Sequence, residues 1–236
     1  MDRTKLNQYL DDLVEECSDQ DKELLIEKLA SLMMVFPAAD YEYMLVFLRD
    51  KQIISVEQFK ELRKKFLEAN KNLIVYGISS RMFAEIWAVE QLKRLDVRFK
   101  TADKSLDAEY VGQYEALFES IKLGVKACRA MNPYVEGDRF QAALRYDLTK
   151  PFVIRFRQLM PEMCEVFVLL GVWVDRTIYW VLSVKELKEI KYLIKEEKFN
   201  MSYILTIDHR NIVEFEKFII PEAELTNAIM AKTKKF

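Results

Sequence analysis

Turn-forming residues are scarce in this chain of 236 residues, which contains five glycines and five prolines. Average usage of these two residues together is roughly 12%. A chain with so few turn formers is expected to be rich in helix. The sequence contains neither G-x-G-x-x-G nor G-x-x-x-x-G-K-[ST], so the glycine-rich loops that cradle dinucleotides and nucleotide phosphates are missing. No nucleotide cofactor is therefore expected.

Metal-binding and membrane-spanning patterns are also missing. The single histidine, His209, excludes a histidine-rich metal site, and the three cysteines show no C-x-x-C spacing for zinc. Unpatterned thiols indicate a reducing compartment. The longest apolar run, residues 166–174, is much shorter than the roughly 20 residues that a transmembrane helix needs. These features predict a cytoplasmic protein with no membrane partner.

The charges nearly balance, because 36 lysines and arginines oppose 38 aspartates and glutamates and leave a formal charge of −2. No global basic field therefore attracts nucleic acid, and any polyanion has to be bound by a local patch. Hydrophobic residues make up 51% and charged residues 31% of the chain, which is typical of a folded globular protein.

Two domains are expected from the change in pattern along the chain. Residues 1–70 show helical spacing of leucines, and Ser55 with Gln58 forms a capping box at the start of one helix. Residues 71–236 mix helical and strand patterns. The segment 121–127 alternates strictly between apolar and other residues, as a strand does.

Further strands and helices are predicted in the second half of the chain. Residues 166–174 and 178–182 predict a hairpin of buried strands at the centre of a sheet, and residues 185–198 predict a helix. Together these patterns give an α+β fold, in which an N-terminal helical domain precedes a mixed α/β domain with a helix-flanked sheet.

One constellation resembles a known family. Gly112-Gln113-Tyr114 precedes Glu115, and the segment Gly124-Val125-Lys126-Ala127-Cys128-Arg129-Ala130 follows on the next strand. This resembles type II restriction endonuclease-like proteins of the PD-(D/E)XK superfamily, in which G-Q-Y-D is followed by E-V-K-A-S-R-A. The resemblance implies two carboxylates that bind Mg²⁺, a lysine beside the attacking water, and a helix that carries a further glutamate. Lys126, Glu115 and Glu85 occupy the corresponding catalytic positions.

The chain departs from that pattern at two positions. Glu115 replaces an aspartate and can still bind a hard cation, whereas Gly124 replaces the glutamate of E-x-K, which removes a ligand and a negative charge. Two interpretations stay open. In the first, catalysis is lost and the fold is kept for binding. In the second, another glutamate takes over the role of the missing ligand, so that Glu115 would hold the metal together with Glu119 or with Glu85.

A locally basic segment with interleaved aromatic residues suits contacts with DNA phosphates. It lies between residues 139 and 157, and the second family motif adds one arginine just before it. The residues expected to contact DNA are Arg129, Arg139, Arg145, Arg155, Arg157 and Gln158.

The resemblance implies double-stranded DNA as the partner, a homodimer, and Mg²⁺ as the cofactor if the protein is an active endonuclease. The alternative is a non-enzymatic scaffold or partner subunit that assembles through the helical domain. In that case an apolar stripe would form part of an interface, namely Leu24, Leu25, Leu29, Leu32, Met33 and Phe36.

Overall fold

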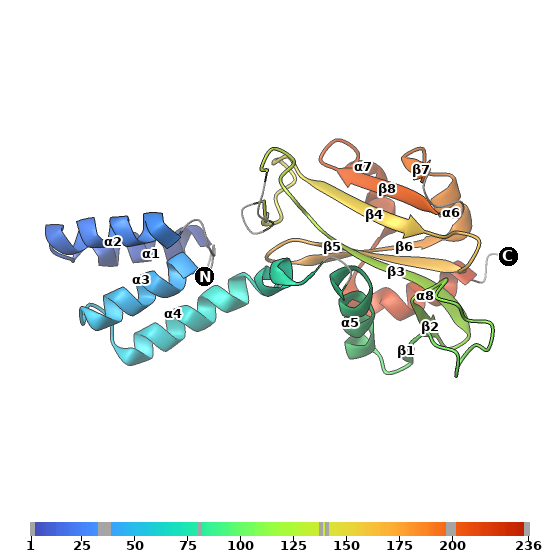
Figure 1. The fold of residues 1–236 in the computed structure, drawn as a ribbon, viewed down its shortest axis with the longest axis horizontal. Helices are drawn as coiled ribbons and strands as arrows, with labels where there is room; N and C mark the ends of the chain where they lie inside the picture. Colours follow the sequence, from blue (N-terminus) through green and yellow to red (C-terminus); the bar gives the residue numbers. More distant parts are fainter. Residues whose placement is uncertain are drawn as a thin grey trace. The chain divides into compact units, whose positions relative to one another are not determined.

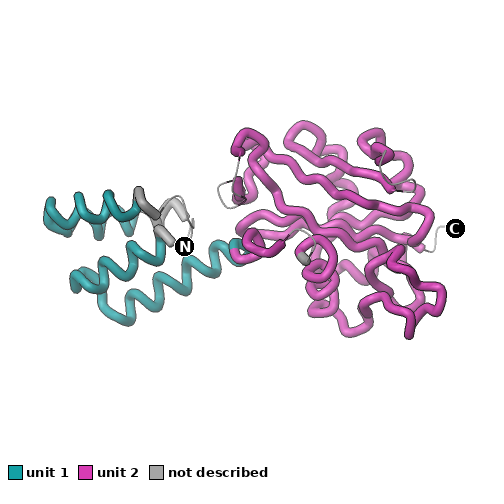
Figure 2. The backbone as a smooth tube through the Cα atoms, in the orientation of Figure 1, with its two compact units in different colours: residues 1–73 teal, residues 74–236 magenta. Residues whose placement is uncertain are grey.

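A computed structural model describes residues 3–32, 39–79, 82–136, 139, 142–196 and 202–233. The chain divides into two compact units, Met1–Leu73 and Ile74–Phe236, shown in separate colours in Figure 2. The sequence pattern placed this division after residue 70.

The first unit is helical, as the sequence predicts. Its helices are α1 (Arg3–Glu15), α2 (Asp19–Leu32), α3 (Ala39–Asp50) and α4 (Val56–Ala69). Leu45 and Leu48 of α3 lie fully buried in its core. In the apolar stripe of α2, Leu25 is buried whereas Leu24 is 41% exposed. The stripe's Met33 and Phe36 lie outside the described residues.

The predicted capping box is present at the start of α4. The Ser55 hydroxyl accepts a hydrogen bond from the Gln58 N–H (3.2 Å), and the Gln58 side chain accepts one from the Ser55 N–H (2.8 Å). Both donors lack partners within the helix, so the box satisfies two groups that would otherwise be unpaired at the helix end.

The second unit contains a six-stranded sheet, which makes the protein α+β. The strand order is β1-β2-β3-β5-β6-β9, and only β3 and β5 run parallel. The strands are β1 (Phe99–Thr101), β2 (Ala116–Phe118), β3 (Ile121–Arg129), β5 (Val166–Val172), β6 (Thr177–Ser183) and β9 (Ile219–Ile220). The predicted hairpin is therefore confirmed as β5–β6, and every residue of β5 is buried.

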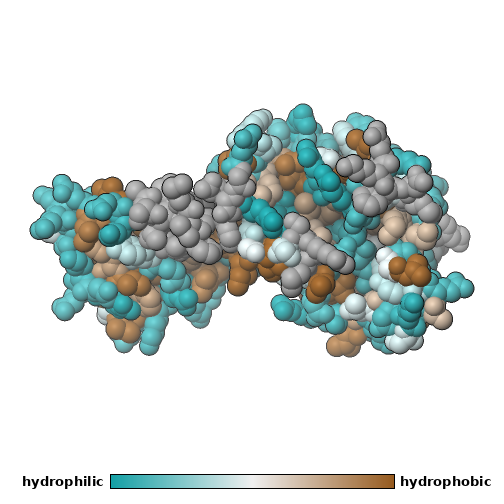
Figure 3. Space-filling model, viewed as in Figure 1, coloured by the Kyte–Doolittle hydropathy of each residue, from teal (hydrophilic) through white to brown (hydrophobic). Residues whose placement is uncertain are grey.

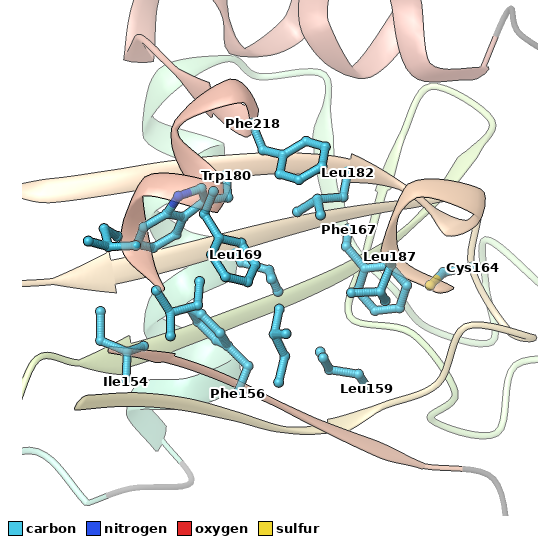
Figure 4. Close-up of a cluster of buried hydrophobic side chains, with 14 of the residues drawn as sticks. Ile154, Phe156, Leu159, Cys164, Phe167, Leu169, Trp180, Leu182, Leu187 and Phe218 are labelled. Atoms are coloured by element: carbon cyan, nitrogen blue, oxygen red, sulfur yellow. The ribbon is translucent and has the colours of Figure 1, made fainter. Parts of the chain in front are cut away.

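A three-stranded sheet packs on one side of the larger sheet. It has the order β4-β8-β7 and consists of β4 (Val153–Leu159), β8 (Tyr203–Asp208) and β7 (Leu193–Lys195). β4 lies in the connection between β3 and β5. Apolar side chains of both sheets form one core, which contains Ile154 and Phe156 of β4 as well as Phe167 and Leu169 of β5 (Figure 4).

Helices cover the other side of the larger sheet, where α5 (Ala88–Leu95) and α8 (Leu225–Thr233) lie (Figure 1). The remaining helical segments are short, namely η1 (Leu73–Gly77), η2 (Met82–Trp87, a π-helical turn), α6 (Val184–Lys188), α7 (Ile212–Phe215), η3 (Glu216–Phe218) and η4 (Glu222–Glu224). The prediction of one helix over residues 185–198 is wrong. After α6 the chain enters β7, because Leu193 pairs with Leu205 of β8 and this distant partner overrides the local helical pattern.

Hydrophobic residues on the face shown in Figure 3 form separate patches among hydrophilic ones. Singly exposed apolar residues such as Val97 and Val213 are normal for a folded protein. Among the described residues, none of the helices combines the length and the apolar character that crossing a bilayer would require.

Candidate functional site

Lys126 occupies an unusual place for a lysine, in the middle of a central strand. In the sheet register it lies in one row with Leu169 of β5 and Trp180 of β6, and both of these belong to the hydrophobic core. Its side chain is only 7% exposed. A lysine is almost never buried unless it is paired, so this ammonium group requires anionic partners.

Two glutamates supply those partners. Glu115 Oε1 lies 2.6 Å from Lys126 Nζ, and Glu85 Oε1 lies 3.4 Å from the same nitrogen. The hairpin between β2 and β3 positions Glu115, because the Glu115 N–H donates to Leu123 O and the Val125 N–H donates to Glu115 Oε2 (2.8 Å). Glu85 comes from η2, and π-helical turns of this kind occur frequently at functional sites.

The pKa values in this cluster reflect one cation between two carboxylates. Burial raises the pKa of Glu115, and Lys126 and the Val125 N–H offset this only in part. Burial by itself lowers the pKa of Lys126, but Glu115 and Glu85 outweigh it, so the pKa of Lys126 is raised. Lys126 is therefore protonated at neutral pH and can donate hydrogen bonds, but it cannot serve as a general base.

Gly124 stands where the family resemblance implies a glutamate, and its surroundings leave no space for a side chain. A Cβ atom at this position would lie 2.5 Å from a ring carbon of Phe167 and 3.1 Å from Cys164 Sγ. Phe167 pairs with Gly124 in the register of β3 and β5, and its ring fills the space above the glycine. Gly124 thus allows the close approach of an aromatic side chain.

The cluster opens into a cleft of about 1060 Å³. Most of the residues that the sequence pattern selected line this one cleft, namely Glu85, Glu115, Lys126, Arg129, Arg139, Arg155, Arg157 and Gln158. Basic side chains outnumber acidic ones among its described lining residues, because Glu196 is the one further acid besides the two glutamates of the cluster. A local positive surface therefore exists in a protein whose total charge is slightly negative.

β4 contributes the basic wall of the cleft. It runs beside β3, and the Arg155 N–H donates to Cys128 Sγ at 3.3 Å. Arg155 and Arg157 stand on either side of the buried Phe156, and both are exposed and line the cleft. Among the described residues, neither arginine has a carboxylate within ion-pair distance, which leaves both guanidinium groups available for an anionic ligand.

Arg129 binds backbone carbonyls beside the cleft. Its Nε donates to Val75 O (2.9 Å), its Nη2 donates to Ile78 O (2.6 Å), and its guanidinium stacks 3.9 Å from the centre of the Phe83 ring. Burial, with a further contribution from the charge of Arg139, lowers the pKa of Arg129 to about 10. Arg129 lines the cleft, but these donors bind backbone carbonyls. Its main structural effect is therefore to fix the segment before η2.

Two predicted residues do not join the cleft. Glu119 lies in the turn after β2, with a φ of 56°, and its carboxylate pairs with Arg98 at 3.0 Å. Because the chain reverses at this turn, Glu119 stands apart from Glu115. Arg145 pairs with Asp175 at 3.9 Å, and neither Glu119 nor Arg145 is among the lining residues. Glu196, which falls within the helix predicted for residues 185–198, does line the cleft.

The donor set limits which metal the site can hold. No group of three or more His, Cys, Asp or Glu side chains suited to a metal occurs within the described ranges. Mg²⁺ is often bound through one or two carboxylates, with water and substrate phosphates completing its shell. Glu85 and Glu115 meet that smaller requirement, so they fit a Mg²⁺ ion that binds together with a phosphate-containing substrate.

Comparisons with known proteins identify no relative. A scan against protein-family models, a search of curated proteins and a search of solved structures each find no match.

Proposed function

We propose that this protein is a restriction-endonuclease-like DNA-binding protein, and that its cleft is a divergent Mg²⁺-dependent site for phosphodiester hydrolysis. One observation carries the proposal. The cluster of Lys126, Glu115 and Glu85 lines the same cleft as Arg155 and Arg157 of β4.

The two parts of the cleft suit the two requirements of such a reaction. Arg155 and Arg157 supply charge for phosphate contacts, which provide most of the affinity in DNA binding. Glu85 and Glu115 would hold Mg²⁺, which stabilises charge that develops on a phosphate. Lys126 keeps its proton, so it donates a hydrogen bond that orients water or a phosphate oxygen. By the same family resemblance, we propose a homodimer, and from the unpatterned cysteines of the sequence we propose a location in the cytoplasm.

The first experiment measures DNA binding over a series of salt concentrations. We expect binding of duplex DNA to weaken with salt, and the double variant Arg155→Gln/Arg157→Gln to bind less tightly with a salt slope reduced by about two phosphate contacts. Arg94→Gln is the matched control, because Arg94 is exposed on α5 and does not line the cleft. It should bind as the wild type does.

The second experiment separates binding from cleavage. A sequence-diverse plasmid mixture is incubated with Mg²⁺ or Mn²⁺ and with the wild type or Lys126→Ala. Cutting that Lys126→Ala abolishes would support a working site. Salt-dependent binding without cutting would keep the DNA-binding function and remove the catalytic one. Absence of DNA binding by the wild type would refute the proposal and favour a scaffold that assembles through the helical unit.

A further inference from the structure

β4 contains an irregularity where it lines the cleft. Phe156 pairs with Leu205 and Leu159 pairs with Tyr203, so β4 has one more residue than β8 between these two pairs. This is a β-bulge, a feature found often next to active sites. Gln158 lies in it with a φ of 54°, a left-handed conformation that is unfavourable for a residue with a side chain.

The bulge changes which side chains face the cleft. In a regular strand, Arg155 and Arg157 would be followed on the exposed side by position 159. The extra residue keeps Leu159 buried and leaves both Arg157 and Gln158 exposed. The strained backbone therefore adds one uncharged polar side chain to a wall of arginines without removing any apolar residue from the core.

The carboxylate of Glu196, the residue directly after β7, holds this conformation. Glu196 Oε2 accepts hydrogen bonds from the Gln158 N–H (3.1 Å) and from the Ser202 hydroxyl (2.8 Å). The Glu196 N–H in turn donates to Ser202 O (2.9 Å). The backbone of Gln158 is thus fixed from outside β4, while its side chain lines the cleft. A fixed backbone limits the positions that the amide group can take.

We propose that Gln158 is a specificity-determining residue, whose amide contacts the edge of one base of the bound DNA, with adenine as the preferred base. This inference depends on DNA binding by the cleft, as proposed above. Arg155 and Arg157 can neutralise phosphates but carry no sequence information when they do so. A glutamine amide offers one donor and one acceptor in a plane, which matches N7 and N6 of adenine in the major groove.

The test selects bound sequences from a random duplex library without divalent metal and then measures relative affinities by competition. We expect the wild type to prefer an A·T pair at one position, and Gln158→Gly to lose about tenfold of that preference, the order of one bidentate contact with a base. Glycine adopts positive φ freely, so this variant keeps the bulge. Gln158→Glu, which keeps the shape but loses the amide donor, should lose the same preference.

Gln52→Gly is the matched control, because Gln52 is also an exposed glutamine at positive φ (60°) but belongs to the helical unit. It should keep the full preference. The inference is overturned if Gln158→Gly retains the preference, or if the wild type binds DNA in a salt-dependent way without any preference. Failure of the wild type to bind any duplex overturns the proposed function as well, so the two failures are distinguishable.

Discussion

Replacing Lys126 by methionine tests whether the buried cluster is organised as the structure shows. The variant keeps the length of the side chain but leaves Glu115 largely buried and without the cation 2.6 Å from its oxygen. Breaking a buried pair by removing one partner costs about 3–5 kcal/mol. We expect a loss of that order in the free energy of unfolding at neutral pH, measured by urea denaturation.

The loss should depend on pH in a defined direction. Burial raises the pKa of Glu115 above its ordinary value of 4.5, and removal of Lys126 raises it further. A group whose folded pKa is raised stabilises the folded state below its unfolded pKa and loses that contribution as the pH rises through the folded pKa. The deficit of Lys126→Met should therefore be smaller near pH 4.5 than at neutral pH.

Two further variants make this prediction refutable. Adding Glu115→Gln to Lys126→Met should recover part of the stability at neutral pH, because a neutral amide replaces the unpaired carboxylate. Lys122→Met is the matched control, since Lys122 lies on the same strand but is 40% exposed, and its loss should be small. Equal deficits at both pH values, with no recovery in the double variant, would show that Glu115 and Lys126 are not coupled.

Two other substitutions test the structure away from the cluster. Tyr76→Phe should lower stability by about 1 kcal/mol in urea denaturation, because the Tyr76 hydroxyl donates to Ala130 O (3.1 Å) and Val172 O (2.9 Å), and an unchanged stability would contradict this buried contact. Ser55→Ala should destabilise α4 by about 1 kcal/mol through loss of its capping box with Gln58, measured as loss of helical circular dichroism on heating; an unchanged melting profile would contradict the cap.

Local patterns were sufficient for the elements whose stability is local. The alternation of residues 121–127 identified β3, the two apolar runs identified the β5–β6 hairpin, and the capping box identified the start of α4. Each of these depends on the period of a strand or on residues three apart, which are visible in the sequence. The same alternation could not reveal that Lys126 is buried, because burial depends on the neighbouring β5 and on Glu115.

Distant pairing explains what the sequence did not reveal. Residues 193–195 form β7 because β8 lies beside them, although the sequence predicts a helix over residues 185–198. Glu196 enters the cleft only as a consequence of that pairing. Arg129 was expected to contact DNA because it is a basic residue in a family motif, but its guanidinium donates hydrogen bonds to the carbonyls of Val75 in η1 and of Ile78 just after it. Neither the pairing of β7 with β8 nor the hydrogen bonds of Arg129 produce a pattern at fixed spacing along the sequence.

The position of the Phe167 ring determines whether a glutamate can be introduced at position 124. Because a Cβ at position 124 would lie 2.5 Å from the Phe167 ring, Gly124→Glu alone should be strongly destabilising and should gain no activity. Phe167→Ala alone should cost about 3–5 kcal/mol through the cavity it leaves. The two changes act on the same space, so the loss in the double variant should be smaller than the two separate losses together by about 1–3 kcal/mol.

Urea denaturation of the four proteins in this cycle measures the coupling, and strictly additive losses would refute the view that Phe167 occupies the carboxylate's place. The plasmid assay then gives the functional result. If Glu85 already replaces the missing ligand, the double variant should gain little over the wild type in Mg²⁺-dependent cutting. If the site is inactive because position 124 carries no glutamate, cutting should appear in the double variant and not in Gly124→Glu. Only the double variant gives the new carboxylate room beside Lys126.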